Sequence, residues 1–189
     1  MINISDEIKN ALAVLKKGGT ILYPTETVWG IGCDATNAAA VDKVYKIKRR
    51  NEEKALICLV SNFNMLNQYI EDVPKVAYEI LKCAVKPTTV IYDKPIGVAE
   101  NLIGKDNTLG IRVTRDDFCQ ELIRRLKRPL VSTSANISGQ ETPLTFAQIP
   151  PEILEGVDYV VNLQQSMKTP KPSAVIKLSN DGNVKVIRK

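Results

Sequence analysis

Apolar residues recur every three to four positions in several segments of the chain, a spacing that places them on one face of a helix. The first such segment begins after Ser5, the expected N-cap, and ends at Gly18. The second begins after Asn37, which is the expected cap there. The inward faces of these two helices hold Ile8, Leu12 and Leu15, and then Val41, Val44 and Tyr45. Further helices are expected over residues 64–69, 75–83 and 116–126.

Short runs of β-branched and other apolar residues lie between the helical segments and predict strands. They cover residues 20–23, 56–60, 88–92 and 109–113, with further strands near Leu130, Tyr159, Val175 and Val186. Strands that alternate with helices predict an α/β fold. No repeat or low-complexity tract interrupts the pattern, and residues 164–172, which contain several Lys and Pro, are the expected mobile loop.

The chain has 189 residues, of which 44% are hydrophobic and 25% charged, an ordinary composition for one globular domain covering residues 1–189. Its 26 basic and 21 acidic residues give a net charge of +5, which suits anionic partners and equally fits solvated surface lysines. The first residues lack the pattern of a signal peptide, and no apolar run approaches the roughly 20 residues that span a bilayer. We therefore expect a cytoplasmic protein with no membrane segment.

Histidine is absent from the sequence, and the cysteines are far apart at Cys33, Cys58, Cys83 and Cys119. Without histidine the chain lacks the usual general base, the usual partner of a nucleophilic serine and the commonest transition-metal ligand. The cysteines form no C-x-x-C pair, and three of them have apolar neighbours typical of buried positions. The sequence therefore excludes a serine triad and His-based metal catalysis, and it predicts no zinc site, disulfide framework or other protein-bound metal.

Residues 129–139, Pro-Leu-Val-Ser-Thr-Ser-Ala-Asn-Ile-Ser-Gly, pass from apolar to hydroxyl and amide side chains. A strand entering through Leu130 and Val131 presents polar groups from the loop at its carboxyl end, where open α/β sheets place ligands. These groups are Ser132, Thr133, Ser134, Asn136 and Ser138, none of which is a titrating base. The alternative is a turn followed by a helix cap, because Ser, Thr, Asn and Gly favour both for local backbone reasons.

A basic cluster of Lys48, Arg50 and Lys54 lies at and just beyond the end of the second predicted helix. This spacing gathers cations that can hold desolvated phosphates by point charges and a guanidinium fork. Lysines at the carboxyl end of a helix also favour its dipole and usually stay solvated, so that alternative is open. Arg112 differs, because it interrupts a strand otherwise suited to burial, where a charge is costly unless it meets an anion.

The segment 30–35, Gly-Ile-Gly-Cys-Asp-Ala, fits the dinucleotide-binding pattern G-x-G-x-x-A. Such a site needs a strand directly before the first glycine and an acidic residue at the end of the next strand. Here residues 24–29 intervene, and Glu52 and Glu53 fall in a charged loop, so the pattern disfavours a Rossmann site. The motif G-x-x-x-x-G-K-[ST] is also absent, so phosphates must be held by side chains.

Residues 23–35 read Tyr-Pro-Thr-Glu-Thr-Val-Trp-Gly-Ile-Gly-Cys-Asp-Ala, and the chain continues with Lys48-x-Arg50 and Ser134-x-Asn136. Together these segments resemble the YrdC-type threonylcarbamoyl-AMP synthase family, which carries Pro-Thr-(Asp/Glu)-Thr-Val-Tyr-Gly-Leu-Gly, then Lys-x-Arg, then Ser-x-Asn. The likeness continues through residues 108–113, 172–176 and 184–188, in family order. It therefore spans nearly the whole chain.

The resemblance implies a single YrdC-like domain, an α/β fold with a twisted mixed β-sheet flanked by helices and a concave basic face. It implies a nucleotidyltransferase that joins L-threonine, bicarbonate and ATP into threonylcarbamoyl-AMP and releases pyrophosphate, with Mg²⁺ accompanying ATP. The product would serve the threonylcarbamoyladenosine modification of tRNA through a downstream transferase complex. Such chemistry requires positioned reactants and neutralised phosphate charge, and it needs no histidine or covalent nucleophile.

The same resemblance assigns roles to individual residues by position. Threonine or its carbamate would contact Thr27, Arg112, Ser132 and Ser173. ATP would contact Arg50, Lys54, Thr108, Ser134, Thr142 and Arg188. The two short motifs, Lys48 with Arg50 and Ser134 with Asn136, would carry the catalytic role.

Three positions depart from the family pattern: Trp29 replaces a Tyr, Ala55 a Pro, and Leu59 a His on the following strand. The missing His would remove a hydrogen bond from a ligand near that strand. A paralogue of the YciO kind, with the fold but a different or weaker reaction, therefore stays open. So does a double-stranded RNA or tRNA binder, which needs a basic groove but not Thr27 or Ser132. With 5% aromatic residues, any RNA contact should be to the backbone.

Overall fold

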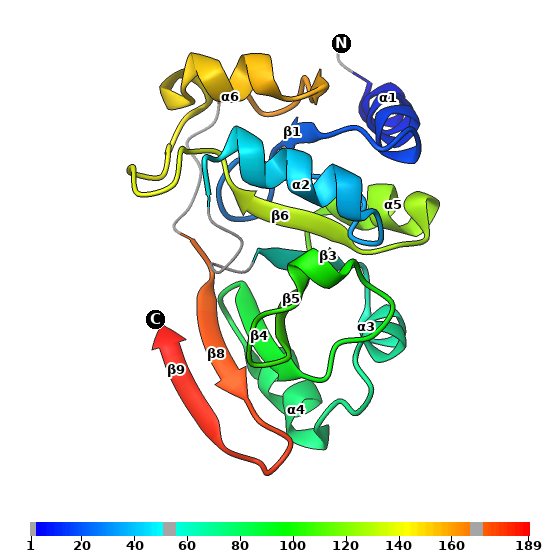
Figure 1. Cartoon of the computed structure of the whole chain (residues 1–189), viewed down its shortest axis with the longest axis vertical. Helices are drawn as coiled ribbons and strands as arrows, with labels where there is room; N and C mark the ends of the chain where they lie inside the picture. The colour runs from blue at the N-terminus through cyan, green and yellow to red at the C-terminus, as the bar shows by residue number, and fades with distance from the viewer. Residues whose placement is uncertain (1–2, 51–55, 167–171) are drawn as a thin grey trace.

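Figure 1 shows the computed structural model, which describes residues 3–50, 56–166 and 172–189. One mixed sheet runs through it in the strand order β7-β1-β2-β6-β3-β5-β4-β8-β9. Its strands are β1 (Ile21–Tyr23), β2 (Gly30–Gly32), β3 (Ile57–Val60), β4 (Thr88–Asp93), β5 (Thr108–Val113), β6 (Leu130–Ser134), β7 (Tyr159–Val160), β8 (Ala174–Leu178) and β9 (Val184–Arg188). Parallel pairs (β1 with β7, β3 with β5, β4 with β8) mix with antiparallel ones, which confirms the expected α/β class.

The helices connect these strands and lie on both faces of the sheet. They are α1 (Ile4–Lys16), α2 (Ala38–Ile47), α3 (Phe63–Tyr69), α4 (Lys75–Cys83), α5 (Asp117–Leu126) and α6 (Pro151–Gly156), with short 3₁₀ turns at Glu100–Leu102 and Phe146–Gln148. The sequence pattern predicted five of these helices and missed α6, which is a short helix that begins at a proline.

Side chains alternate between the two faces along each strand, so neighbouring residues pack in different cores. Leu22, Cys58 and Val131 belong to the core under α2, α4 and α6. Their sequence neighbours Tyr23, Leu59 and Leu130 belong to the core under α1 and α5. Figure 1 shows α1 and α5 next to each other, and the two helices are in contact. The central strands are therefore covered on both faces, as their nearly continuous apolar residues indicate, whereas the edge strand β9 is exposed.

Two helix caps show how local chemistry sets the element boundaries. Asn37 caps α2 as predicted, because its side chain accepts a hydrogen bond from the backbone N–H of Ala40 at 3.1 Å. The prediction for α1 was wrong: Asn3 is the cap and accepts from the N–H of Ser5 at 3.0 Å, so the helix begins at Ile4. Because Asn3 already caps the first turn, Ser5 lies inside the helix as its second residue.

The glycines of the 30–35 segment form strand β2, between β1 and β6. A Cβ on Gly32 would lie 2.3 Å from the carbonyl oxygen of Val131 and 2.8 Å from the Tyr23 ring. The position therefore requires glycine for close strand packing. This placement excludes the dinucleotide loop, because β2 lies inside the sheet and its glycines are not at the N-terminus of a helix.

Three of the four cysteines, Cys33, Cys58 and Cys119, are buried, while Cys83 is exposed. This confirms the burial expected from their neighbours. Across the described ranges, no helix is both long and apolar enough to cross a membrane. Most of the loop predicted to be mobile, residues 167–171, lies outside the described residues.

Candidate active site

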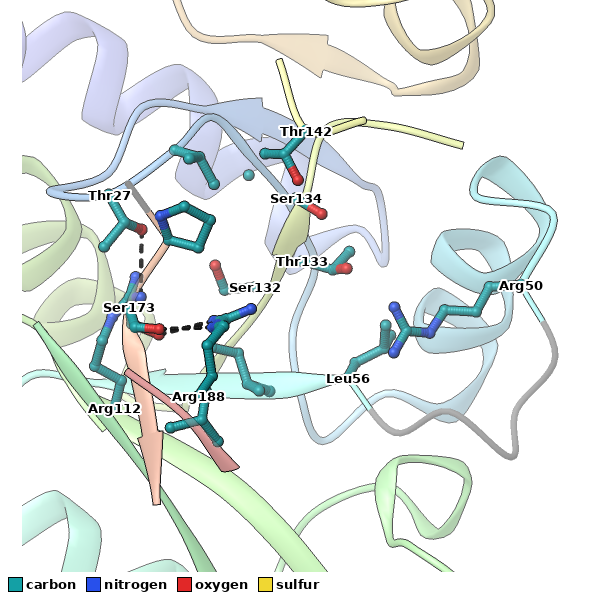
Figure 2. A pocket seen from close by; sticks show the side chains of 15 residues that line it. Thr27, Arg50, Leu56, Arg112, Ser132, Thr133, Ser134, Thr142, Ser173 and Arg188 are labelled. Carbon is teal, nitrogen blue, oxygen red and sulfur yellow. Dashed lines mark hydrogen bonds between the residues drawn. The ribbon is translucent and has the colours of Figure 1, made fainter. Parts of the chain in front are cut away.

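A cleft of about 220 Å³ opens on the sheet face that carries α1 and α5 (Figure 2). Ser132 lies at its base and pairs with Ile57 of β3, which in turn pairs with Gly110 of β5. Ser132 follows Leu130 by two positions, so its side chain lies on the same face of the sheet as Leu130, the face that carries α1 and α5. The lining consists of Thr27, Val28, Gly30, Arg50, Leu56, Ile57, Arg112, Ser132, Thr133, Ser134, Thr142, Pro172, Ser173, Val175 and Arg188.

Eight of the ten residues that the family resemblance assigns to a substrate line this cleft, although they come from distant segments of the chain. They are Thr27, Arg50, Arg112, Ser132, Ser134, Thr142, Ser173 and Arg188. Lys48, Asn136 and Thr108 are not among the lining residues, and Lys54 lies outside the described residues. Thr108 is buried, and its hydroxyl donates to Oδ1 of Asp106 at 2.7 Å.

The polar segment 132–134 belongs to strand β6 and does not form the loop that the sequence predicted. Ser134 still pairs with Gly30 and Ser132 with Ile57, so the strand continues through its hydroxyl residues. Alternation along β6 turns Ser132 and Ser134 to the cleft face. The boundary was misplaced because neighbouring strands on both sides satisfy the backbone of this polar stretch.

Lys48 occupies a different place from the one that the basic spacing predicted. It is 1% exposed, and its Nζ donates to the carbonyls of Ser134 and Asn136 and, at 3.4 Å, to Oδ1 of Asn136. The bond to the Asn136 carbonyl measures 2.7 Å. Burial and, to a smaller extent, the charge of Arg50 lower the pKa of Lys48 to about 7. The side chain thus holds the segment that contains Ser134 and Asn136. Of the two members of the basic cluster that the structure describes, Arg50 is the one that lines the cleft.

Asn136 completes this unit. Its Oδ1 accepts the hydroxyl proton of Ser134, and its amide Nδ2 donates to the carbonyl of Gln140 at 2.7 Å. The backbone N–H of Ser138 in turn donates to the carbonyl of Lys48 at 2.9 Å. The Lys-x-Arg and Ser-x-Asn motifs are therefore joined in one hydrogen-bonded network beside the cleft.

Arg112 projects from β5 into the cleft and is 3% exposed. Its Nη1 donates to the hydroxyl of Thr27 at 3.3 Å, and its Nε lies 3.2 Å from Oε1 of Glu26 without the alignment of a hydrogen bond. The sequence predicted that a charge on this strand must meet an anion, and in the structure Arg112 forms an ion pair with Glu26. Glu26 itself was missed by the sequence analysis, although it sits between two threonines of the matched motif.

The turn before β2 is held by its own hydroxyl groups. Thr25 donates to the carbonyl of Val28 at 2.9 Å and accepts from the N–H of Thr27 at 3.0 Å. The Thr25 and Thr27 hydroxyls lie 2.9 Å apart. Because the Thr25 proton goes to the carbonyl, Thr27 is the donor in that contact. These bonds explain why the segment carries Thr at both positions and why the Thr27 hydroxyl reaches Arg112.

Arg188 enters the cleft from β9 through a register shift opposite Val175 and Ile176 of β8. Arg188 pairs with Val175 and Val186 with Ile176, so Ile187 is the extra residue of a bulge. The guanidinium donates from Nε to the Ser173 carbonyl at 2.8 Å and from Nη2 to the Ser173 hydroxyl at 3.4 Å (Figure 2). Burial and then the nearby Arg112 lower the pKa of Arg188. Several cations thus face one cavity, which suits a polyanionic ligand.

Two of the departures from the family pattern fall in the core. Leu59 is fully buried and packs in the core that contains Phe118 and Leu130, while its register partner is Arg112. Trp29 is 1% exposed, and its ring centroid lies 5.0 Å from that of Phe146. Ala55 lies outside the described residues. Neither Leu59 nor Trp29 lines the cleft.

Thr133 was singled out in the polar run after Val131, whereas the other remaining lining residues have ordinary core side chains and were not predicted as site residues. Val28, Leu56, Ile57 and Val175 provide an apolar surface, and Thr133, Gly30 and Pro172 complete the wall. Only their neighbours in the matched motifs could have indicated them. Among the described residues, no group of three or more acidic, Cys or His side chains could hold a metal ion.

The fold and the arginine-lined cleft define an α/β domain suited to a small polyanion and a polar co-substrate. The chain belongs to the Sua5, YciO and YrdC family, whose model, described as "Telomere recombination", matches residues 13–189. The threonylcarbamoyl-AMP synthase of Idiomarina loihiensis is 37% identical over 149 residues, which are 77% of this chain and 80% of the relative. That of Pseudoalteromonas translucida is 35% identical over 159 residues, 82% and 84% of the two chains.

Solved structures agree with this assignment. A variant of P. abyssi Sua5 superposes with a TM-score of 0.88 at 25% identity and covers 99% of this chain, which spans 57% of that protein. E. coli YciO superposes with a TM-score of 0.85 at 26% identity and covers 100% of this chain and 91% of its own. P. abyssi Sua5 complexed with L-threonine gives a TM-score of 0.82 at 24% identity over 94% of this chain and 52% of its own, and it supports the fold.

Proposed function

We propose that the chain is an L-threonylcarbamoyladenylate synthase, which forms threonylcarbamoyl-AMP and pyrophosphate from L-threonine, bicarbonate and ATP. The observation that carries this proposal is that eight residues matched to the synthase pattern, from separate segments, line a single cleft. Relatives named threonylcarbamoyl-AMP synthase that are 35–37% identical over most of the chain support it.

The cleft can position the reactants of this chemistry. Bicarbonate supplies carbon dioxide and hydroxide; the threonine amine captures the carbon dioxide as a carbamate, and the hydroxide takes the amine proton to form water. A carbamate oxygen then attacks the α-phosphorus of ATP, and the bond from that phosphorus to the pyrophosphate oxygen breaks. Pyrophosphate leaves with the electron pair of that bond. The reaction needs alignment and neutralised charge more than a titrating base. Two guanidinium groups, Arg50 and Arg188, supply that neutralisation on this proposal, while Arg112 holds the threonine carboxylate.

The two substrates occupy different ends of the cleft on this proposal. Threonine contacts Thr27, Arg112, Ser132 and Ser173, and its carboxylate meets the guanidinium of Arg112. ATP contacts Arg50, Ser134, Thr142 and Arg188 in the cleft; Lys54 and Thr108, which the family match also assigns to ATP, are not among the described lining residues. Lys48 and Asn136 act through Ser134, which they hold in place.

Magnesium accompanies ATP on this proposal. The described residues offer neutral hydroxyl oxygens beside the cleft and no cluster of acidic side chains, which fits an ion held mainly by the phosphates. Such an ion helps to neutralise the phosphate oxygens. The adenylate product would pass to the transferase complex that modifies tRNA, and we expect this reaction to take place in the cytoplasm.

A paralogue of the YciO kind is the second candidate. The burial of Leu59 favours it, because the family's histidine is replaced by a core residue beside Arg112. An ATP-consumption assay separates the two. The synthase consumes ATP when both threonine and bicarbonate are present and releases pyrophosphate. Release of inorganic phosphate, or ATP consumption that does not depend on threonine, would contradict the synthase and favour the paralogue.

A further inference from the structure

Glu26 is a partly buried carboxylate beside Arg112, and it is not among the residues assigned to threonine or ATP. Its Oε1 lies 3.2 Å from Nε of Arg112, and its Oε2 accepts the hydroxyl proton of Thr114 at 2.9 Å. The side chains of Arg112 and Glu26 are 3% and 17% exposed, so solvent screens their interaction weakly. The pair therefore brings almost no net charge to its end of the cleft.

Glu26 reaches Arg112 from outside the cleft. It lines a second hollow of about 200 Å³, together with Phe63, Leu81 and Val113, and it is not among the residues that line the cleft. The carboxylate approaches the Nε side of the guanidinium, while Nη1 donates to the Thr27 hydroxyl on the cleft side. Glu26 thus changes the charge of the site without taking any of its volume.

Arg188, on the same cleft, has different partners. Its nitrogens donate to the carbonyl and the hydroxyl of Ser173, which are neutral groups. No ion pair is found for Arg188 in the part of the chain that the structure describes. The cleft therefore combines one arginine neutralised by a carboxylate with one held by neutral oxygens.

We propose that Glu26 is a specificity-determining residue, which makes the Arg112 end of the cleft favour a zwitterionic amino acid over phosphate and other simple anions. A free amino acid carries no net charge at neutral pH, so it loses little when Arg112 is neutralised and still gains the guanidinium contacts to its carboxylate. A phosphate is attracted by net positive charge wherever it occurs. Neutralising Arg112 removes the net positive charge that would attract phosphate to this end, so the difference in affinity between the two ligands shifts toward the amino acid. The inference rests on the proposed function.

The test uses the whole chain without ATP. L-Threonine is titrated by calorimetry at several fixed concentrations of inorganic phosphate, and phosphate is titrated alone. In Glu26→Gln we expect phosphate to compete with threonine on the order of tenfold more strongly than in the wild type. The positive charge of Arg112 is then no longer neutralised by a carboxylate, so it attracts phosphate. Glu26→Asp keeps the charge and should keep the wild-type preference. Glu121→Gln is the matched control, since Glu121 pairs with Arg124 and Arg125 on α5 and changes the net charge equally.

Unchanged phosphate competition in Glu26→Gln would overturn the inference, and so would an equal increase in Glu121→Gln. If Glu26→Gln does not fold, Glu26→Asp decides: loss of the threonine preference there, despite the retained charge, would overturn it. The proposed function fails separately. A wild-type chain that binds no threonine contradicts the synthase, while the direct phosphate titration of Glu26→Gln still measures the charge effect.

Discussion

The Nζ of Lys48 donates a 2.7 Å hydrogen bond to the backbone carbonyl of Asn136, 88 positions later in the chain. It also donates to the carbonyl of Ser134, so the end of α2 is tied directly to the segment that follows β6. Lys48 is buried and donates its protons to backbone oxygens, so its role is to hold the segment around Ser134 and Asn136 in position. The two short motifs are consequently parts of one structural unit, with Lys48 as its positioning residue.

Replacing Lys48 with Met should lower both stability and nucleotide affinity. The buried carbonyl of Asn136 loses its donor, whereas the partly buried carbonyl of Ser134 keeps the backbone N–H of Asn136. A buried acceptor without a donor costs about 1–3 kcal/mol, so we expect the free energy of unfolding to fall by about that amount. Urea denaturation measures this change, and calorimetry measures the ATP affinity. Lys43→Met is the control, because Lys43 donates to the carbonyl of Gly18 at 3.1 Å from an exposed position. Equal effects of the two substitutions would contradict the positioning role.

ATP binding should be linked to proton uptake at Lys48. Burial and Arg50 lower the pKa of Lys48 to about 7, so at pH 8 much of the amine is neutral in the free protein. Phosphates held by Arg50 favour the ammonium and raise this pKa on binding. We therefore expect proton uptake at pH 8 and little at pH 6, where the amine is already protonated. Calorimetry in buffers of different ionisation enthalpy detects it. An equal uptake in Lys48→Met would assign the proton elsewhere.

Arg112→Gln and Arg50→Ala should separate the two substrates. Losing a charged hydrogen bond costs about 1.5–3 kcal/mol, which is roughly 10- to 100-fold in affinity. We expect Arg112→Gln to raise the KM for threonine by that factor and to leave the KM for ATP nearly unchanged, with the reverse for Arg50→Ala. Steady-state kinetics with each substrate varied in turn provide the measurement. Equal loss for both substrates in both variants would show that the cleft is not divided as proposed.

The fold was largely predictable because its helices and strands are strongly patterned. Asn37, the α2 face and the strands around Leu59 and Ile111 follow from periodicity and capping alone. Strand β2 was missed because two of its three residues are glycines, whose place in the sheet is set by the approach of Val131. That contact joins residues far apart in sequence, and no local pattern contains it.

The site was predictable as a set of residues but not as a geometry. Hydroxyl and basic side chains indicated a ligand, and the family resemblance selected among them. The burial of Lys48 and the pairing of Glu26 with Arg112 depend on segments that meet through the fold. A lysine that binds phosphate and one that binds carbonyls look the same in sequence.

Leu59→His should destabilise the protein without improving the use of threonine. Leu59 is fully buried against Phe118 and Leu130, so an imidazole there would bury a polar group and leave apolar volume unfilled. We expect a loss of about 2 kcal/mol or more and a lower melting temperature. Thermal unfolding and the threonine KM are measured on the same preparation. A lower KM with an unchanged melting temperature would instead place this position at the threonine pocket.

The mass of the nucleotide product tests the central claim most directly. The chain is incubated with ATP, L-threonine, bicarbonate and Mg²⁺, and the nucleotides are analysed by mass spectrometry. We predict threonylcarbamoyl-AMP, with ¹³C from labelled bicarbonate in its carbamoyl group and pyrophosphate in equal amount. ADP with inorganic phosphate, or AMP that forms without threonine and carries no carbamoyl group, would contradict the assignment as a synthase.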